Sequence, residues 1–94
     1  MFAIAFDLDI NVLDEEHPEN ALHAYGDITR TLRSFGLYRA FGNLYLADDD
    51  ENMSNLFNAL RALKEYPWFA SAVRDIHAFR VEQWSNFIDF FETA

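Results

Sequence analysis

The chain has 94 residues, of which 51% are hydrophobic and 17% are aromatic, and its formal net charge at pH 7 is −9. Seven Lys and Arg residues against sixteen Asp and Glu residues argue against sequence-independent nucleic-acid binding over a broad basic surface. The lack of cysteine excludes disulfides, thiol catalysis and cysteine metal sites, and no apolar run approaches the ~18 residues of a membrane span.

A chain of this length suits one domain, which we expect to span residues 1–94. Ten Phe, four Tyr and two Trp are generous for so small a chain and indicate that apolar surface is buried against a second copy. The lack of cysteine and of a charged-then-apolar leader predicts a cytoplasmic protein that does not contact a membrane.

The first ten residues, MFAIAFDLDI, have the alternation of a β-strand. Apolar residues occupy both sides until Asp7, so both faces of this strand should be covered. A buried strand that becomes acidic at one end places a carboxylate where a core meets an opening. Asp7 is therefore the first candidate functional residue.

The stretch 11–20 is polar and acidic, and Pro18 within it is expected in the first turn of a helix that has Gly36 just past its end. The polar side of this helix carries Glu19, His23 and Asp27 at i, i+4 spacing, which predicts a solvated ion-pairing face rather than a metal site. Its apolar face repeats at steps of four and three and consists of Ala21, Tyr25, Ile28, Leu32 and Phe35.

The second half of the chain predicts further elements in alternation. Two short strands, 38–41 and 43–47, meet at Gly42, and a helix over 53–66 ends before Pro67. An aromatic connection then leads to a strand over 74–81 and to a last helix after Ser85. The order β-α-β-β-α-β predicts an α+β, ferredoxin-like fold: a four-stranded antiparallel sheet in the order 4-1-3-2, with both helices on one face. The last helix is an addition to it.

In such a fold, Ala3, Ala5 and Asp7 lie on the sheet face that the helices leave open. We expect a homodimer joined sheet to sheet over this face, with Asp7 of each copy at a shared cleft. Two facing carboxylates must share a proton, bind a cation such as Mg²⁺, or remain hydrated. The first suits general acid–base catalysis and the second suits phosphoryl transfer. The plainer alternative is a solvated aspartate at a strand end.

Several stretches together resemble virulence-associated protein D, the VapD family. They are AFDLDI, AYGDI, FGNLY, NLFNALRALKEYPWF and SAVRDIHAFRVEQWSNFIDF, and they cover nearly the whole chain. That family is similar in fold to the small Cas-two protein of CRISPR adaptation, a ferredoxin-like homodimer. The resemblance implies an endoribonuclease that cleaves RNA as the toxin of a bacterial toxin–antitoxin pair, with a small antitoxin protein as a partner.

The resemblance also implies roles for individual residues. Asp7 matches the strand-end aspartate that is usually proposed as catalytic, and it is the candidate Mg²⁺ ligand. Family members carry Gln-Gly-Ser where this chain reads Phe41-Gly42-Asn43, so Asn43 replaces the hydroxyl of the second catalytic candidate with an amide. The expected RNA-binding residues are Arg39, Gly42, Tyr45, Arg74 and Arg80, with Tyr45 stacking on a base.

A second hypothesis is a dimeric binding module that engages a protein partner or holds nucleic acid without cutting it. The net charge of −9 and the amide of Asn43 favour this alternative. A third possibility, a small-molecule regulator, has no supporting motif, because the sequence lacks a glycine-rich phosphate loop and a ligand triad. An RNA cleavage assay with and without Mg²⁺ separates the first two.

Overall fold

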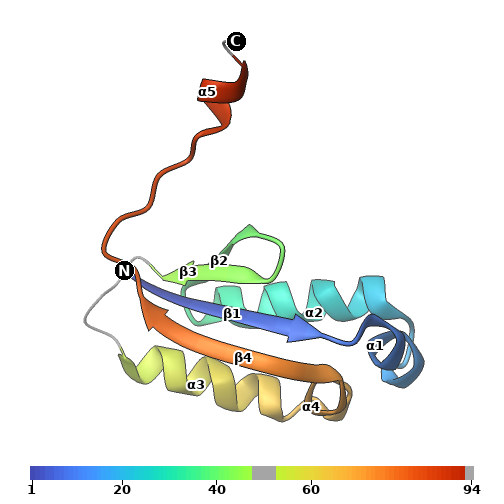
Figure 1. Ribbon diagram of the computed structural model, residues 1–94. Coiled ribbons are helices and arrows are strands. Elements are labelled where there is room, and N and C mark those ends of the chain that lie inside the picture. The colour runs from blue at the N-terminus through green and yellow to red at the C-terminus, as the bar shows by residue number, and fades with distance from the viewer. Residues whose placement is uncertain (48–52, 93–94) are drawn as a thin grey trace.

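A computed structural model describes residues 1–47 and 53–92 as an α+β fold (Figure 1). Its strands form one four-stranded antiparallel sheet. In chain order the elements are β1 (Phe2–Leu8), α1 (Ile10–Glu16), α2 (Ala21–Ser34), β2 (Leu37–Phe41), β3 (Leu44–Ala47), α3 (Met53–Lys64), α4 (Pro67–Ala72), β4 (Val73–Arg80) and α5 (Ile88–Glu92).

The sheet has the strand order β2-β3-β1-β4, so β1 lies inside the sheet, as predicted. Ile4 of β1 pairs with Tyr45 of β3 on one side and with Ala78 of β4 on the other. The register of β1 against β4 shifts between Asp7 and Leu8, where β1 ends. Two strands thus protect the backbone of β1 over most of its length.

The core lies between the sheet and the helices α2 and α3. Ile4 of β1 and both Ile28 and Leu32 of α2 are fully buried. Phe6 stacks on Tyr45 with ring centroids 5.8 Å apart and meets Phe69 of α4 edge to face. The side chains of β1 with even numbers therefore face the helices, which was the predicted orientation.

The acidic end of the first strand differs from the prediction. The strand ends at Leu8, and Asp9 caps α1 because its Oδ1 accepts hydrogen bonds from the backbone N–H groups of Asn11 and Val12. Ile10 begins α1 and is 59% exposed, so it does not extend the buried stripe of β1. A helix-capping aspartate ended the strand earlier than hydropathy alone indicated.

Two prolines also have different roles from those predicted. Pro18 precedes α2, which begins at Ala21 with Asn20 as its cap, so it is not in the first turn of that helix. Pro67 occupies the first turn of α4, a six-residue helix where we expected an irregular aromatic connection. The predicted end of α2 is confirmed, since Gly36 follows it with a φ of +82°.

The C-terminal segment 81–92 projects away from the body of the molecule (Figure 1). The predicted last helix begins at Ile88 and not directly after Ser85, and none of its described residues is buried. Near the base of the segment, Trp84 stacks on Phe41 with ring centroids 6.1 Å apart. Within one chain, α5 therefore does not pack on the sheet.

None of the helices that the structure describes is both long and apolar enough to cross a membrane.

Candidate functional site

Asp7 lies at the end of the central strand, on the sheet face opposite the helices. Its side chain is exposed, whereas its neighbours Phe6 and Leu8 point into the core. Asp75 of β4 is its cross-strand partner, so the two carboxylates project from the same face. Like charges in directly opposed positions destabilise a sheet, and such a conflict is typical of a site selected for chemistry.

Arg74 supplies positive charge next to these carboxylates. Its guanidinium donates a hydrogen bond to Oδ2 of Asp9 at 2.7 Å. This bond to Asp9 raises the pKa of Arg74, and the charge of Asp7 raises it further. The same bond holds the pKa of Asp9 below its ordinary value. Asp7, Asp9 and Arg74 thus form one charged cluster at this end of the sheet.

His77 extends this cluster along β4. Its Nε2 lies 2.9 Å from Oδ2 of Asp75, and its cross-strand partner is Ala5. His77 therefore shares the open face with Asp7, two residue pairs further along the sheet. Both members of the His77–Asp75 pair are largely exposed, so a substrate can reach them.

Carboxylates are the metal-ligand candidates at this end of the sheet. The described residues contain no group of three or more Asp, Glu or His side chains that could hold a metal ion. Asp7 and Asp75 form a pair of carboxylates, and Mg²⁺ commonly binds through one or two carboxylates while keeping several water ligands. Within one chain, these two carboxylates suit a Mg²⁺ ion that keeps several water ligands, but they do not suit an ion coordinated by protein groups alone.

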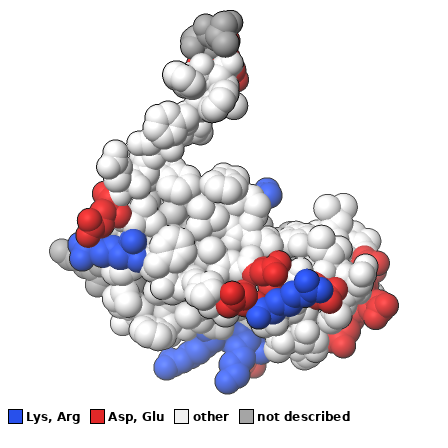
Figure 2. Space-filling view, in the orientation of Figure 1, with Lys and Arg blue, Asp and Glu red and all other residues white. Residues whose placement is uncertain are grey.

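The rest of the open face is apolar. The residues of this face, by register, are Ala3, Ala5, Tyr38, Phe41, Leu44, Leu46 and Phe79. Tyr38, Phe41 and Phe79 are 52%, 64% and 43% exposed. Figure 2 shows one group of charged side chains near the end of β1 and another beside the base of the projecting segment, with a largely uncharged surface between them. One chain by itself therefore leaves a contiguous apolar surface uncovered.

The predicted residues around Gly42 do not share the face of Asp7. Arg39, Gly42, Asn43 and Tyr45 line a cavity of about 750 Å³ between the β2–β3 hairpin and α2. The backbone nevertheless joins the two places, because the N–H of Phe6 donates to the carbonyl oxygen of Asn43 at 3.2 Å. Asp7 and the cavity thus lie at the same end of the sheet, on opposite faces.

Tyr45 occupies a different environment from the one that base stacking requires. The residue is only 2% exposed, and its ring packs against Phe6 inside the core. Its hydroxyl lies 2.8 Å from Oγ1 of Thr29 on α2. The expectation that this ring stacks on a base is therefore wrong for the described conformation, because the core already covers the ring.

Arg80 lies far from Asp7 within one chain. It pairs with Phe2 at the opposite end of β1, and it lines a small cavity with Met1 and Trp84. Phe2 and Asp7 are five residue steps apart along the strand, which is about 17 Å at the usual rise of a β-strand. Arg80 cannot contact the same phosphate as Arg74 in one chain.

The sequence did not single out Arg30 and Arg33 of α2, which line the cavity with Arg39. Gly26, a helical glycine one turn before Arg30 and two turns before Arg33, is the sequence feature that could have indicated them. A Cβ atom at this position would meet nothing within 4 Å. Gly26 therefore leaves the wall of the cavity open.

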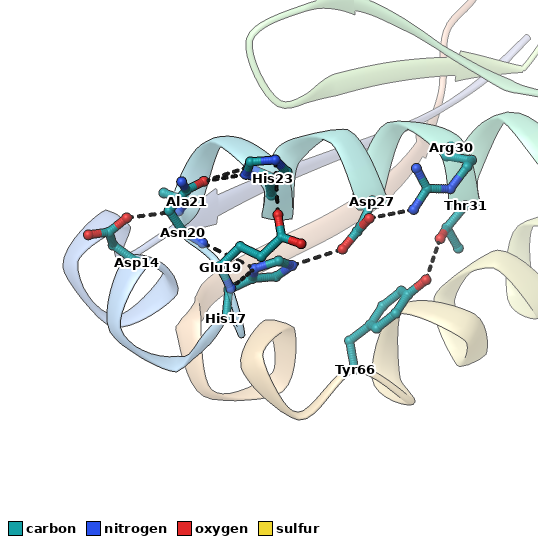
Figure 3. A network of polar contacts seen from close by, with 10 residues as sticks. All are labelled: Asp14, His17, Glu19, Asn20, Ala21, His23, Asp27, Arg30, Thr31 and Tyr66. Carbon is teal, nitrogen blue, oxygen red and sulfur yellow. Dashed lines mark hydrogen bonds and ion pairs between the residues drawn. The ribbon is translucent and has the colours of Figure 1, made fainter.

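A network of polar contacts holds the N-terminal part of α2 against α1 and α4 (Figure 3). His17 is buried against Trp68, and its Nδ1 accepts hydrogen bonds from the N–H groups of Glu19 and Asn20. Its Nε2 therefore carries the proton and donates to Oδ2 of Asp27 at 2.8 Å. This bond from His17 lowers the pKa of Asp27.

The same network contains the predicted ion-pairing face of α2. His23 lies 2.9 Å from Glu19, and Asp27 pairs with Arg30, which confirms the solvated ion pairs expected there. Because Nδ1 of His17 is used by the backbone, this histidine serves the structure rather than proton transfer.

Comparisons with known proteins agree on one family. The chain is 52% identical to an endoribonuclease VapD homolog of Neisseria gonorrhoeae over 93% of this chain and 94% of that protein. It is 48% identical to the endoribonuclease VapD of Haemophilus influenzae, over 96% and 97% of the two chains. It is 41% identical to that of Dichelobacter nodosus, over 93% and 92%. No family model matches the chain.

Proposed function

The chain belongs to the VapD family, and from this membership we propose that it is an endoribonuclease that cleaves RNA at Asp7. The observation that carries the proposal is its 52% and 48% identity, over nearly full length, to proteins named endoribonucleases. The exposed carboxylate of Asp7 at the end of the central strand supports the choice of residue.

Asp7 can act either as a general base or as a Mg²⁺ ligand, and the neighbouring residues have different functions in the two cases. As a general base, it takes the proton of the RNA 2′-hydroxyl while the 2′-oxygen attacks phosphorus. The bond to the 5′-oxygen then breaks, and His77 supplies the proton that this oxygen takes. As a Mg²⁺ ligand with Asp75, it would instead hold the ion whose charge stabilises the phosphate.

We further propose that the active form is a ferredoxin-like homodimer joined through the open face. The uncovered side chains of Tyr38, Phe41 and Phe79 favour this arrangement, because a second copy would bury them. Asp7 lies at the margin of this surface and would face its counterpart across a shared cleft. A stable monomer at micromolar concentration in light scattering would contradict it.

The substrate contacts follow from the positions of the basic groups. Arg74 stands next to Asp7 and is proposed to hold the phosphate that is cleaved. Arg39, Gly42 and Asn43 are proposed to contact the RNA on the other face of the sheet end. Arg80 would contact RNA only at the opposite end of the sheet, or across a dimer.

Replacement of the central carboxylate tests the proposal. The Asp7→Asn variant should cleave RNA about 10²- to 10⁴-fold more slowly than the wild type, because it lacks a base or metal ligand. Glu15→Gln, an exposed acid-to-amide change on α1, is the matched control and should keep full activity. Equal cleavage by wild type and Asp7→Asn would show that Asp7 is not catalytic.

The two roles of Asp7 give different results with modified substrates. If Asp7 is the base, RNA with a 2′-deoxy sugar at the cleaved bond resists cleavage, and a chelator has no effect. If Asp7 holds Mg²⁺, a chelator abolishes cleavage and added Mg²⁺ restores it. An intact dimer that cuts no RNA under either condition would favour the alternative, a binding module.

The biological setting is proposed from the family resemblance. As the toxin of a toxin–antitoxin pair in the cytoplasm, the protein should slow bacterial growth when its expression is induced. The Asp7→Asn variant should not slow growth, and co-expression of a small antitoxin protein should restore it. Equal growth arrest by both forms would separate toxicity from RNA cleavage.

A further inference from the structure

The cavity between α2 and the β2–β3 hairpin has the size of a small-ligand site. Its volume of about 750 Å³ falls within the usual range of such sites, which is about 300–1,000 Å³. Leu22 and Tyr25 form an apolar rim on α2, and Gly42 and Asn43 form the opposite rim on the hairpin. The hydroxyls of Thr29 and Tyr45 lie between them.

The charge of this cavity contrasts with that of the chain. Three of the seven Lys and Arg residues, Arg30, Arg33 and Arg39, line it, and the described lining residues include no Asp or Glu. The chain as a whole has a net charge of −9, so a local cluster of three cations is not an average property of its surface. The lining of the cavity is therefore suited to an anionic ligand.

The three arginines are held in place by contacts that use few of their donors. Arg39 donates through Nε to the carbonyl oxygen of Gly42 at 2.7 Å, and Arg33 lies over the ring of Tyr38 at 5.8 Å. Arg30 pairs with Asp27. Each guanidinium has five N–H donors, so these contacts orient the groups and leave donors for a phosphate.

We propose that this cavity binds a nucleotide, with its phosphate on Arg33 and Arg39 and its base against Tyr25 and Leu22. The inference deepens the proposed function and rests on it for the choice of a nucleotide among anions. The nucleotide is either free or one unit of a single-stranded RNA that passes from Asp7 around the end of the sheet. The backbone contact between Phe6 and Asn43 makes this path short.

Gly26 provides a variant that fills the cavity without harming the fold. A Cβ atom there meets nothing within 4 Å, so a leucine side chain would extend into the cavity. Glycine is about 0.8–1 kcal/mol less favourable than alanine in a helix, and leucine ranks close to alanine. Gly26→Leu should therefore melt at the same or a higher temperature than the wild type, which separates loss of binding from loss of folding.

Calorimetric titration of the full chain with adenosine 5′-monophosphate tests the proposal, with inorganic phosphate and adenosine as partial ligands. We expect both partial ligands to bind at least about tenfold more weakly than the nucleotide. Arg33→Gln and Gly26→Leu should each weaken nucleotide binding at least about tenfold. Arg61→Gln, an equal change of charge on an exposed position of α3, should leave it within about twofold.

Several results would overturn the proposal. If Arg33→Gln and Arg61→Gln weaken nucleotide binding equally, the binding is general charge attraction. If Gly26→Leu binds the nucleotide as the wild type does, the ligand lies outside the cavity. Phosphate that binds as tightly as the nucleotide would leave no role for the base. An uncleavable 2′-O-methyl trinucleotide identifies the source: binding tenfold tighter than the mononucleotide indicates RNA, and equal binding indicates a free nucleotide.

The same titration with Asp7→Asn keeps this proposal separate from the proposed function. Asp7 does not line the cavity, so this variant should bind the nucleotide as the wild type does. A chain that binds the nucleotide but never cuts RNA contradicts only the nuclease. A chain that cuts RNA but binds no nucleotide here contradicts only the cavity.

Discussion

The two faces of strand β1 differ in how completely one chain buries them. On the covered face, Ile4 is fully buried among residues of the same chain, such as Leu32 and Ile28. On the open face, Ala3 is buried by its cross-strand neighbours, but Phe79 and Tyr38 around it remain about half exposed. One chain buries the first face by itself, and the second face is the proposed dimer surface. This contrast can be tested one side chain at a time.

The largest effect on stability is expected on the covered face. Leu32→Ala removes a fully buried side chain from the core and should lower the free energy of unfolding by about 2–5 kcal/mol. Chemical denaturation followed by circular dichroism measures this loss. It should be similar at low and high protein concentration, and a strong dependence on concentration would show that α2 belongs to an interface.

A smaller loss is expected at the polar network of α2. His17→Ala leaves the N–H groups of Glu19 and Asn20 and the carboxylate of Asp27 without their partner. The free energy of unfolding should fall by about 1–3 kcal/mol. Denaturation curves of His23→Ala, whose histidine is exposed on the same helix, give the control, with an expected change under about 0.5 kcal/mol.

On the open face, the effect should be on association. Phe79→Ser removes an exposed aromatic ring of the proposed dimer surface and should weaken dimerisation about tenfold, as truncated interface anchors commonly do. Sedimentation at several concentrations measures it. Phe57→Ser, a similarly exposed position on α3, should leave dimerisation unchanged, and equal weakening by both would contradict the open face as the interface.

The smallest effect concerns acid stability. The bond from His17 holds the pKa of Asp27 below its ordinary value of 3.8, so the folded state favours the ionised carboxylate. The stability that Asp27 contributes is therefore present above pH 3.8 and is lost as the pH falls through the lowered pKa. Asp27→Asn should show a shallower loss of stability below this pH in thermal melts. An unchanged slope would contradict this role.

The sequence predicted elements whose periodicity is long and regular. The alternation of β1, the apolar stripe of α2 and the hairpin at Gly42 all occur where they were expected, and together they imply the observed strand order. The short helices α1 and α4 were missed because six or seven residues carry too little periodicity to outweigh nearby polar or aromatic composition.

For the candidate site, the sequence indicated residues but not their faces. Asp7 and Asn43 are both at one end of the sheet, yet they lie on opposite faces of it. Their faces depend on the register between strands, which the sequence of one strand does not determine. Arg30 and Arg33 resemble ordinary solvated helix positions until the hairpin is placed opposite them. Tyr45 was expected to be exposed, but α2 covers this part of the sheet and buries its ring.

The position of β1 between an early and a late strand has a consequence for biosynthesis. One neighbour of β1 is β4, which ends at Arg80, so a ribosome has made most of the chain before the central strand can be fully paired. A product truncated before Val73 would expose the edge of an almost wholly apolar strand, which is a template for aggregation. Incomplete chains of this protein should therefore be removed by quality control rather than persist as partly active fragments.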